Sequence, residues 1–189
     1  IQVALFNILE EGDVQIRGFK VRLPLGVQFV FTANPEDYTN RGSIVTPLKD
    51  RIGSQILTHY PQDLETARRI TAQEAARVPA QEKGIQVPEL ARDLLEQISF
   101  EARKSEYVDR KSGVSARMSI TAFENLLSTA ERRMLKTGEK NTVIRLGDFM
   151  GVLPAITGKI ELVYEGEQEG ADNVAQILVE EAVKTVFAT

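Results

Sequence analysis

The spacing of apolar residues changes near Pro61, and this change constrains the fold more than any other feature of the 189-residue chain. Before it, short apolar runs separated by turn signals are typical of strands and turns. After it, apolar residues recur every three to four positions, as in amphipathic helices. We therefore expect an α/β part over residues 1–61, followed by a mostly helical part.

The first part is expected to alternate helices and strands. The run over 27–33 is rich in β-branched and aromatic residues and is typical of a buried strand. Thr46 and Pro47 supply an N-cap and a first-turn proline for a short helix. The expected elements, in order, are a helix over 3–9, a hairpin over 14–23 that turns at Gly18, the strand over 27–33, the short helix over 46–51 and a strand over 55–60.

The second part divides again near residue 157. Helices are expected over 62–157, and an acidic strand-helix extension over 158–189. Nine acidic residues and four basic residues follow position 138, so the acidic surplus lies towards the C-terminus. The expected elements are a helix over 63–78, a helix from 88 with Leu90, Leu94, Leu95 and Ile98 on its inner face, a helix capped by Ser119, a short helix over 146–153, a strand over 160–164 and a helix over 172–187.

Composition excludes several classes of site. The chain has no cysteine and one histidine, so disulfides, thiolate metal sites and multi-histidine zinc sites are excluded, and His59 is interpreted as structural. The net charge of −4 gives no electrostatic basis for binding nucleic acid or an anionic membrane. No metal site is expected within the chain, because the acids at 165, 167 and 169 lack EF-hand spacing and are interpreted as a solvated loop. No membrane span or signal peptide is visible, and we expect a cytoplasmic protein.

Two polar residues of the α/β part are candidates for catalysis. Asn34 stands at the C-terminal tip of the strand over 27–33, where ligands gather in open α/β sheets, and an amide there can orient an attacking water. The alternative is a turn formed by Asn34 and Pro35. Arg51 ends the sequence Leu48–Arg51, and its guanidinium can bind phosphate oxygens with two hydrogen bonds. The alternative is an ordinary surface pair with Asp50.

A third candidate, Arg117, begins the helix near Ser119. A cation at a helix N-terminus opposes the helix dipole, which indicates a partner anion. The alternative is a surface arginine that the helix tolerates at a small energetic cost.

The order of these features resembles the AAA+ ATPases of the magnesium-chelatase subunit I and MoxR-like group. The segments Leu9–Gly12 and Thr32–Asp37 are also similar to that group, and the resemblance extends over residues 1 to about 154. It implies the C-terminal part of an AAA+ α/β nucleotide-binding core, with a hairpin insert, followed by a helical lid. It further implies that Asn34 positions the lytic water, that Arg51 acts on ATP bound to the neighbouring subunit, and that Arg117 contacts nucleotide from the lid.

The resemblance implies ATP and Mg²⁺ as cofactors, with their main ligands upstream. No Gly-x-x-x-x-Gly-Lys-Ser/Thr loop occurs, and no strand ends in the Asp-Glu pair that would hold Mg²⁺. Ile1 lies within an amphipathic stretch without a start methionine, so we expect the native protein to extend upstream. The chain by itself is expected not to hydrolyse ATP.

The implied function is ATP hydrolysis by a homo-oligomeric ring, commonly a hexamer, coupled to remodelling of a partner or to metal insertion. A von Willebrand factor A-type protein is the implied partner, and general MoxR-like remodelling ranks above chelation. The alternative is a non-catalytic, lid-type protein-interaction module. A helicase ranks third because of the acidic charge. A phosphate-binding loop upstream of Ile1 would favour the ATPase over the interaction module.

Overall fold

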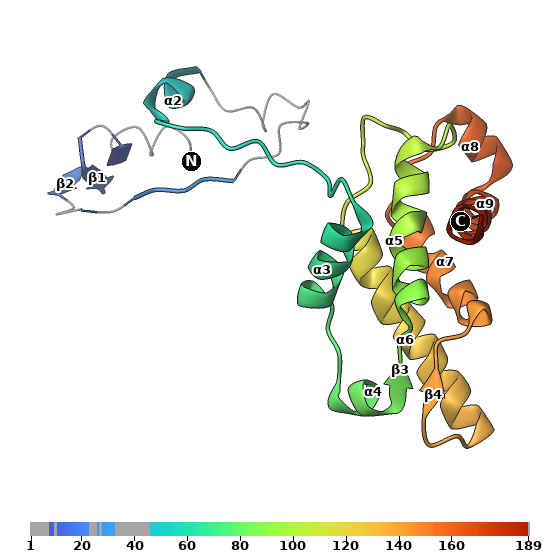
Figure 1. Cartoon of the computed structure of the whole chain (residues 1–189). Coiled ribbons are helices and arrows are strands. Elements are labelled where there is room, and N and C mark those ends of the chain that lie inside the picture. Colours follow the sequence, from blue (N-terminus) through green and yellow to red (C-terminus); the bar gives the residue numbers. More distant parts are fainter. Residues whose placement is uncertain (1–7, 10, 23–25, 27, 33–45, 189) are drawn as a thin grey trace. The chain divides into compact units, whose positions relative to one another are not determined.

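A computed structural model describes residues 8–9, 11–22, 26, 28–32 and 46–188 (Figure 1). The chain divides between Thr58 and His59 into two compact units. Unit 1 covers the N-terminal residues up to Thr58, and unit 2 covers the remainder. The division lies close to the change in apolar spacing at Pro61.

Unit 1 contains a hairpin. Strand β1 (Asp13–Ile16) pairs antiparallel with β2 (Phe19–Arg22), and Ile16 lies opposite Phe19. The connecting residues Arg17 and Gly18 both have positive φ, 49° and 88°. Positive φ at both positions is characteristic of the type I′ turn, whose twist matches that of the two strands. The predicted hairpin is confirmed over the described residues 13–22.

The strands predicted over 27–33 and 55–60 are not formed by the described residues. Residues 28–32 and 55–60 have no strand assignment, and Val30, Ile56 and Leu57 are 80%, 89% and 75% exposed. A strand needs a neighbour that pairs with its backbone N–H and C=O groups, and none of the described residues supplies one. The prediction of a buried strand is therefore wrong for 28–32, as is that of a strand over 55–60. Helix α2 (Thr46–Arg51) is formed, whereas most of the predicted helix over 3–9 lies outside the described residues.

None of the described helices combines the length and the apolar composition that crossing a membrane requires.

Unit 2 consists mainly of helices, with two short strands that pair in parallel. Its elements are α3 (Leu64–Glu74), α4 (Pro79–Gly84), β3 (Ile85–Gln86), α5 (Glu89–Lys104), α6 (Arg117–Thr137), β4 (Thr142–Val143), the 3₁₀ helix η1 (Leu146–Val152), α7 (Leu153–Thr157), α8 (Tyr164–Glu169) and α9 (Ala171–Phe187).

Helix α5 occupies the centre of unit 2, with α3, α6 and α9 packed against it (Figure 1). All six residues from 94 to 99 are buried. A helix that buries one face exposes some of any six consecutive residues, so α5 must be covered on several sides. Polar residues of α5 are therefore buried together with its apolar residues. Leu90, predicted to lie on the inner face, is instead 47% exposed at the start of the helix.

Helix α6 begins at Arg117, two residues before the predicted cap at Ser119. Ser115 organises the first turn: its Oγ accepts the N–H of Arg117 at 3.2 Å, and its carbonyl oxygen accepts the N–H of Met118 at 2.9 Å. Ser119 is buried within the helix, where its Oγ lies 2.6 Å from the Oγ of Ser99 on α5. The pattern of the sequence predicts an inner face for this helix, and that face is confirmed except at Ile120, which is only half-buried. The predicted residues are Ile120, Phe123, Leu126, Leu127 and Ala130.

The segment over 158–188 contributes buried residues to the core of unit 2. Four residues of α9 are buried, and α9 packs along α5. The predicted strand over 160–164 is wrong, because only Leu162 pairs, in an isolated bridge with Val108. The predicted acidic loop is the helix α8. Glu165 and Glu167 stand in its first turn, where the helix dipole favours negative charge.

A hydrogen-bonded ion pair joins the last turns of α6 to η1. Arg133 binds the carboxylate of Asp148 with Nε and Nη2, at 2.9 and 2.8 Å. Its Nη1 also donates to Thr142 Oγ1, and its Nη2 to the carbonyl oxygen of Val143, at 2.8 and 2.9 Å. The Asp148 side chain is 4% exposed, and it also accepts the N–H of Arg145 at 2.8 Å. Arg133 on α6 therefore binds both β4 and η1.

Candidate functional site

The connection between α5 and α6, residues 105–116, carries the polar groups closest to Arg117 in the sequence. It is anchored by Val108 and Val114, which are 2% and 1% exposed. Between these anchors, Asp109 accepts the N–H of Lys111 at 2.9 Å and the hydroxyl of Ser112 at 3.0 Å. The hydrogen bond from Lys111 is the main cause of a lowered pKa for Asp109, so this carboxylate stays ionised at neutral pH. The connection is thus an ordered turn.

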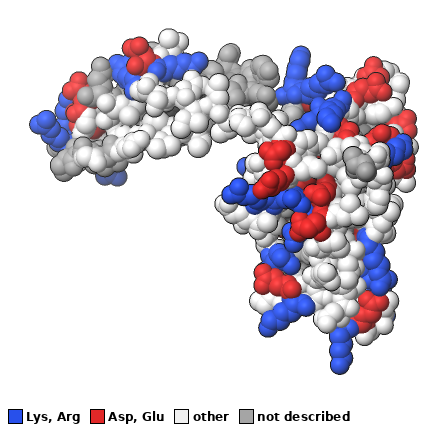
Figure 2. Space-filling model, viewed as in Figure 1, with Lys and Arg blue, Asp and Glu red and all other residues white. Residues whose placement is uncertain are grey.

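Exposed basic side chains gather at this connection (Figure 2). From position 104 to position 117 there are four lysines and arginines and two acidic residues. The four basic residues, all exposed, are Lys104, Arg110, Lys111 and Arg117. A local excess of positive charge attracts anions, and it is located here in a chain whose net charge is negative.

Arg117 is the first residue of a helix of 21 residues, and its side chain is exposed. The N-terminus of such a helix carries partial positive charge, so a cation there is disfavoured by about 0.3–1 kcal/mol in the absence of an anion. Some arginines of unit 2 are paired with carboxylates: Arg68 lies 2.6 Å from Glu89 and 3.1 Å from Asp93. No such acidic partner accompanies Arg117 among the residues that the structure describes. The helix start and the guanidinium together favour an anion.

A second arginine, Arg103, contacts this connection from helix α5. The guanidinium carbon of Arg103 lies 4.5 Å from the ring centroid of Tyr60 and 5.4 Å from that of Phe100. Its Nε donates to the carbonyl oxygen of Val114 at 3.3 Å. Burial lowers the pKa of Arg103, but a guanidinium remains charged at neutral pH. Contacts of this kind with aromatic rings contribute about 0.5–2 kcal/mol, more when they are desolvated.

Gly113 allows the aromatic ring of Tyr60 to approach the connection. Its φ is +69°, in the left-handed region that glycine adopts without strain. A Cβ added to Gly113 would lie 2.2 Å from the hydroxyl oxygen of Tyr60. No side chain fits at this position while Tyr60 stays where it is.

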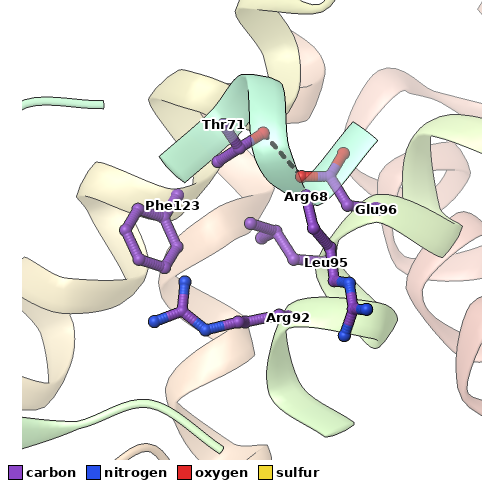
Figure 3. Close-up of a pocket in the computed structure, with 6 residues that line it drawn as sticks. All are labelled: Arg68, Thr71, Arg92, Leu95, Glu96 and Phe123. Carbon is purple, nitrogen blue, oxygen red and sulfur yellow. Dashed lines mark hydrogen bonds between the residues drawn. The ribbon is translucent and has the colours of Figure 1, made fainter. Parts of the chain in front are cut away.

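A small pocket lies between α3, α5 and α6 (Figure 3). The residues that line it are Arg68, Thr71, Arg92, Leu95, Glu96 and Phe123. It has space for little more than one water molecule, so it is not a nucleotide site. Glu96 is 3% exposed and accepts a hydrogen bond from Thr71 Oγ1 at 2.5 Å. The guanidinium of Arg92 lies 5.6 Å from the ring centroid of Phe123. Burial raises the pKa of Glu96, and the hydrogen bond from Thr71 offsets this only in part.

The raised pKa of Glu96 predicts a pH-dependent cost in stability. A carboxyl group that is harder to ionise in the folded state than in the unfolded state costs nothing below its unfolded pKa, and the cost develops as the pH rises through its folded pKa. Glu96→Gln keeps the acceptor for Thr71 and removes the charge. We expect it to raise the free energy of unfolding by about 1 kcal/mol at pH 8, with the gain disappearing towards pH 4. Urea denaturation across this range measures it.

The matched control is Glu82→Gln, because Glu82 is an exposed carboxylate on α4. It should give the same unfolding free energy as the unmodified chain at every pH. A gain for Glu96→Gln that stays constant with pH would contradict a charge on Glu96 as its cause.

The three residues predicted from the sequence have different outcomes. Arg117 lies at the start of α6, as described above. Arg51 is the last residue of α2 in unit 1, with an exposed side chain. Asn34 lies outside the described residues. Arg51 and Arg117 therefore belong to different units. His59 is exposed, and its Nδ1 lies 2.8 Å from the carbonyl oxygen of Tyr60.

Three residues near the site were missed by sequence reasoning. The sequence pattern predicts a strand at Tyr60, and only the proline that follows it indicates a special conformation. Arg103 looks like a favourable cation in the last turn of a helix. Glu96 looks like a solvent-facing residue, and no sequence signal shows that α3 covers it. In each case the partner lies far away in the sequence.

The chemistry available here is the binding of an anion by Arg117 and its basic neighbours, which fits a phosphate group. Within the described ranges, no group of three histidine, aspartate or glutamate side chains is arranged to hold a metal ion. The chain matches no protein-family model, no curated protein and no solved structure.

Proposed function

We propose that this chain is the C-terminal part of an AAA+ ATPase of the magnesium-chelatase subunit I and MoxR-like group. Residues 1–61 belong to the α/β core, residues 62–157 form the helical lid, and residues 158–189 are a C-terminal extension. The observation that carries the proposal is the position of Arg117, an exposed guanidinium at the positive end of a 21-residue helix and at the end of a basic connection. This arrangement is suited to a polyphosphate.

In this proposal Arg117 binds the phosphate oxygens of ATP. Asn34 positions the attacking water, and Arg51 reaches the γ-phosphate bound to a neighbouring subunit. The phosphate-binding loop and the Mg²⁺ ligands are supplied by sequence upstream of Ile1. The assembly is a ring, commonly of six subunits, that remodels a partner such as a von Willebrand factor A-type protein or inserts a metal ion.

Arg117→Ala tests the proposal in the full-length protein. Loss of one charge-assisted contact of about 1.5–3 kcal/mol predicts nucleotide affinity lowered by roughly 10- to 100-fold. The fold should be kept, because the side chain is exposed and its removal relieves an unfavourable interaction with the helix dipole. Titration with a fluorescent ATP analogue and thermal unfolding measure the two quantities.

Arg132→Ala is the matched control, since Arg132 is an exposed arginine on the same helix. It should leave nucleotide affinity unchanged. Equal affinities for the Arg117 and Arg132 variants would remove Arg117 from the nucleotide site.

A non-catalytic interaction module is the second candidate. It is favoured by the contiguous hydrophobic core of unit 2, to which residues of α5, α6 and α9 contribute. The same titration separates the candidates, because a module of this kind gives no specific ATP binding in the full-length protein.

A further inference from the structure

The chain enters unit 2 through a short and stiff segment. Unit 2 begins at His59, and Tyr60 is followed by Pro61. Proline restricts its own φ and confines the preceding residue to extended conformations. Two residues after Pro61, Asp63 caps α3 by accepting the N–H of Thr66 at 2.7 Å. Little flexibility remains between Tyr60 and the body of unit 2.

Tyr60 holds the α5–α6 connection at two points. The face of its ring covers the guanidinium of Arg103, and its hydroxyl fits against Gly113. Arg103 in turn donates to the carbonyl oxygen of Val114. The buried Nη1 of Arg103 makes no hydrogen bond in the described part of the chain. Two aromatic rings therefore cover the guanidinium, and Tyr60 supplies the closer ring.

The two contact points lie immediately before α6. Gly113 and Val114 precede Arg117 by four and three residues, and Val114 is fixed in the core. A displacement of the chain where it enters unit 2 must therefore either move this connection or break the contact between Tyr60 and Arg103. Arg103 thus contacts both Tyr60, where the chain enters unit 2, and Val114, three residues before the start of α6.

We propose that Tyr60 is a positioning residue that acts through Arg103 to hold the α5–α6 connection, and with it Arg117, in a fixed relation to the entry of the chain into unit 2. The proposal rests on the proposed role of Arg117 in binding nucleotide. It adds a means by which a displacement of Tyr60 reaches that arginine.

Hydrogen exchange on the 189-residue chain tests the contact without any nucleotide. In Tyr60→Ala, the hydrogen-bonded amides of Lys111, Gly113 and Met118 should exchange about tenfold faster, as expected for loss of one desolvated cation–π contact. Amides of α9 should be unaffected. Tyr60→Phe, which keeps the ring, should exchange nearly as slowly as the unmodified chain.

His59→Ala is the matched control, because His59 is the exposed neighbour of Tyr60 and contacts only its carbonyl oxygen among the hydrogen bonds of the described residues. It should leave exchange in the connection unchanged. Unchanged exchange in Tyr60→Ala would overturn the proposal, whatever the function of Arg117.

Nucleotide binding in the full-length protein tests whether the contact acts through Arg117. Tyr60→Ala should raise the Kd for ATP severalfold when Arg117 is present and have no further effect in an Arg117→Ala background. Residues that act through one another give such non-additive effects. Independent, multiplying effects would overturn the positioning role. If Arg117→Ala alone leaves the Kd unchanged, the proposed function fails, while the exchange result on Tyr60 still stands.

Discussion

Under the proposed function, replacing Arg51 with alanine is expected to slow ATP hydrolysis about 10³-fold in the assembled full-length protein, with ATP binding unchanged. The reason is that an arginine supplied across a subunit interface stabilises charge on the γ-phosphate in the transition state, and contributes little to binding of the ground state. Arg51→Lys should restore little activity, because an ammonium lacks the planar, two-pronged geometry of guanidinium. Steady-state hydrolysis and nucleotide titration give the two quantities.

Lys49→Ala is the control, since Lys49 is an exposed cation on the same short helix. Its rate should stay near that of the unmodified protein. A comparable loss in Lys49→Ala would show that α2 contributes general positive charge and that Arg51 has no specific role.

Mixing Arg51→Ala with Asn34→Ala determines whether Arg51 acts on its own nucleotide or on that of a neighbour. Asn34 is proposed to act on the nucleotide of its own subunit. At an interface where one subunit supplies Asn34 and the other supplies Arg51, a complete site forms again, so mixed rings should recover part of the activity. Native mass spectrometry establishes that mixed rings are present. Mixed rings that stay inactive at every ratio would place both residues in one subunit's site.

Asp148→Asn is expected to lower the free energy of unfolding by about 3 kcal/mol, because it removes the closer and less exposed of the two carboxylates that pair with Arg133. Asp148 is 4% exposed on its side chain, and Arg133 is 21% exposed. The substitution breaks the paired hydrogen bonds that join α6 to η1. Urea denaturation at pH 7, followed by circular dichroism, measures the loss.

The pH dependence of this loss has a definite sign. Burial acts to raise the pKa of Asp148, but the hydrogen bonds from Arg133 and from the N–H of Arg145 outweigh it, and the pKa is lowered. A carboxylate of this kind stabilises the fold fully above its unfolded pKa near 3.9 and loses that contribution as the pH falls through its folded pKa. The difference between Asp148→Asn and the unmodified chain should therefore be constant from pH 6 to 8 and shrink below about pH 4.

Glu139→Gln serves as the control within the same network. Glu139 lies 3.6 Å from Arg133 and is 33% exposed, so its pairing is screened by water. We expect a loss of at most about 1 kcal/mol. A loss equal to that of Asp148→Asn would show that net charge around Arg133, and not the geometry of the Asp148 pair, stabilises this end of the unit.

Local sequence signals determined much of the secondary structure. The turn at Gly18 and the inner face of α6, with Phe123 and Leu126, depend on interactions within a few residues, which periodicity and turn chemistry report directly. Arg117 could be identified from the sequence as a candidate anion-binding residue for the same reason, since the unfavourable placement of a cation at a helix start is a local property.

Only the tertiary structure decided which residues are enclosed and which segments meet. Glu96 is buried because α3 covers the side of α5 that periodicity assigns to water, and Tyr60 meets Arg103 across 43 positions of sequence. The apolar run around Val30 has every local property of a strand, yet no strand forms among the described residues, because pairing needs a neighbour that a local pattern cannot supply. Burial and strand pairing depend on contacts between distant segments, so they follow from the packing of the whole unit and are not contained in any local stretch of its sequence.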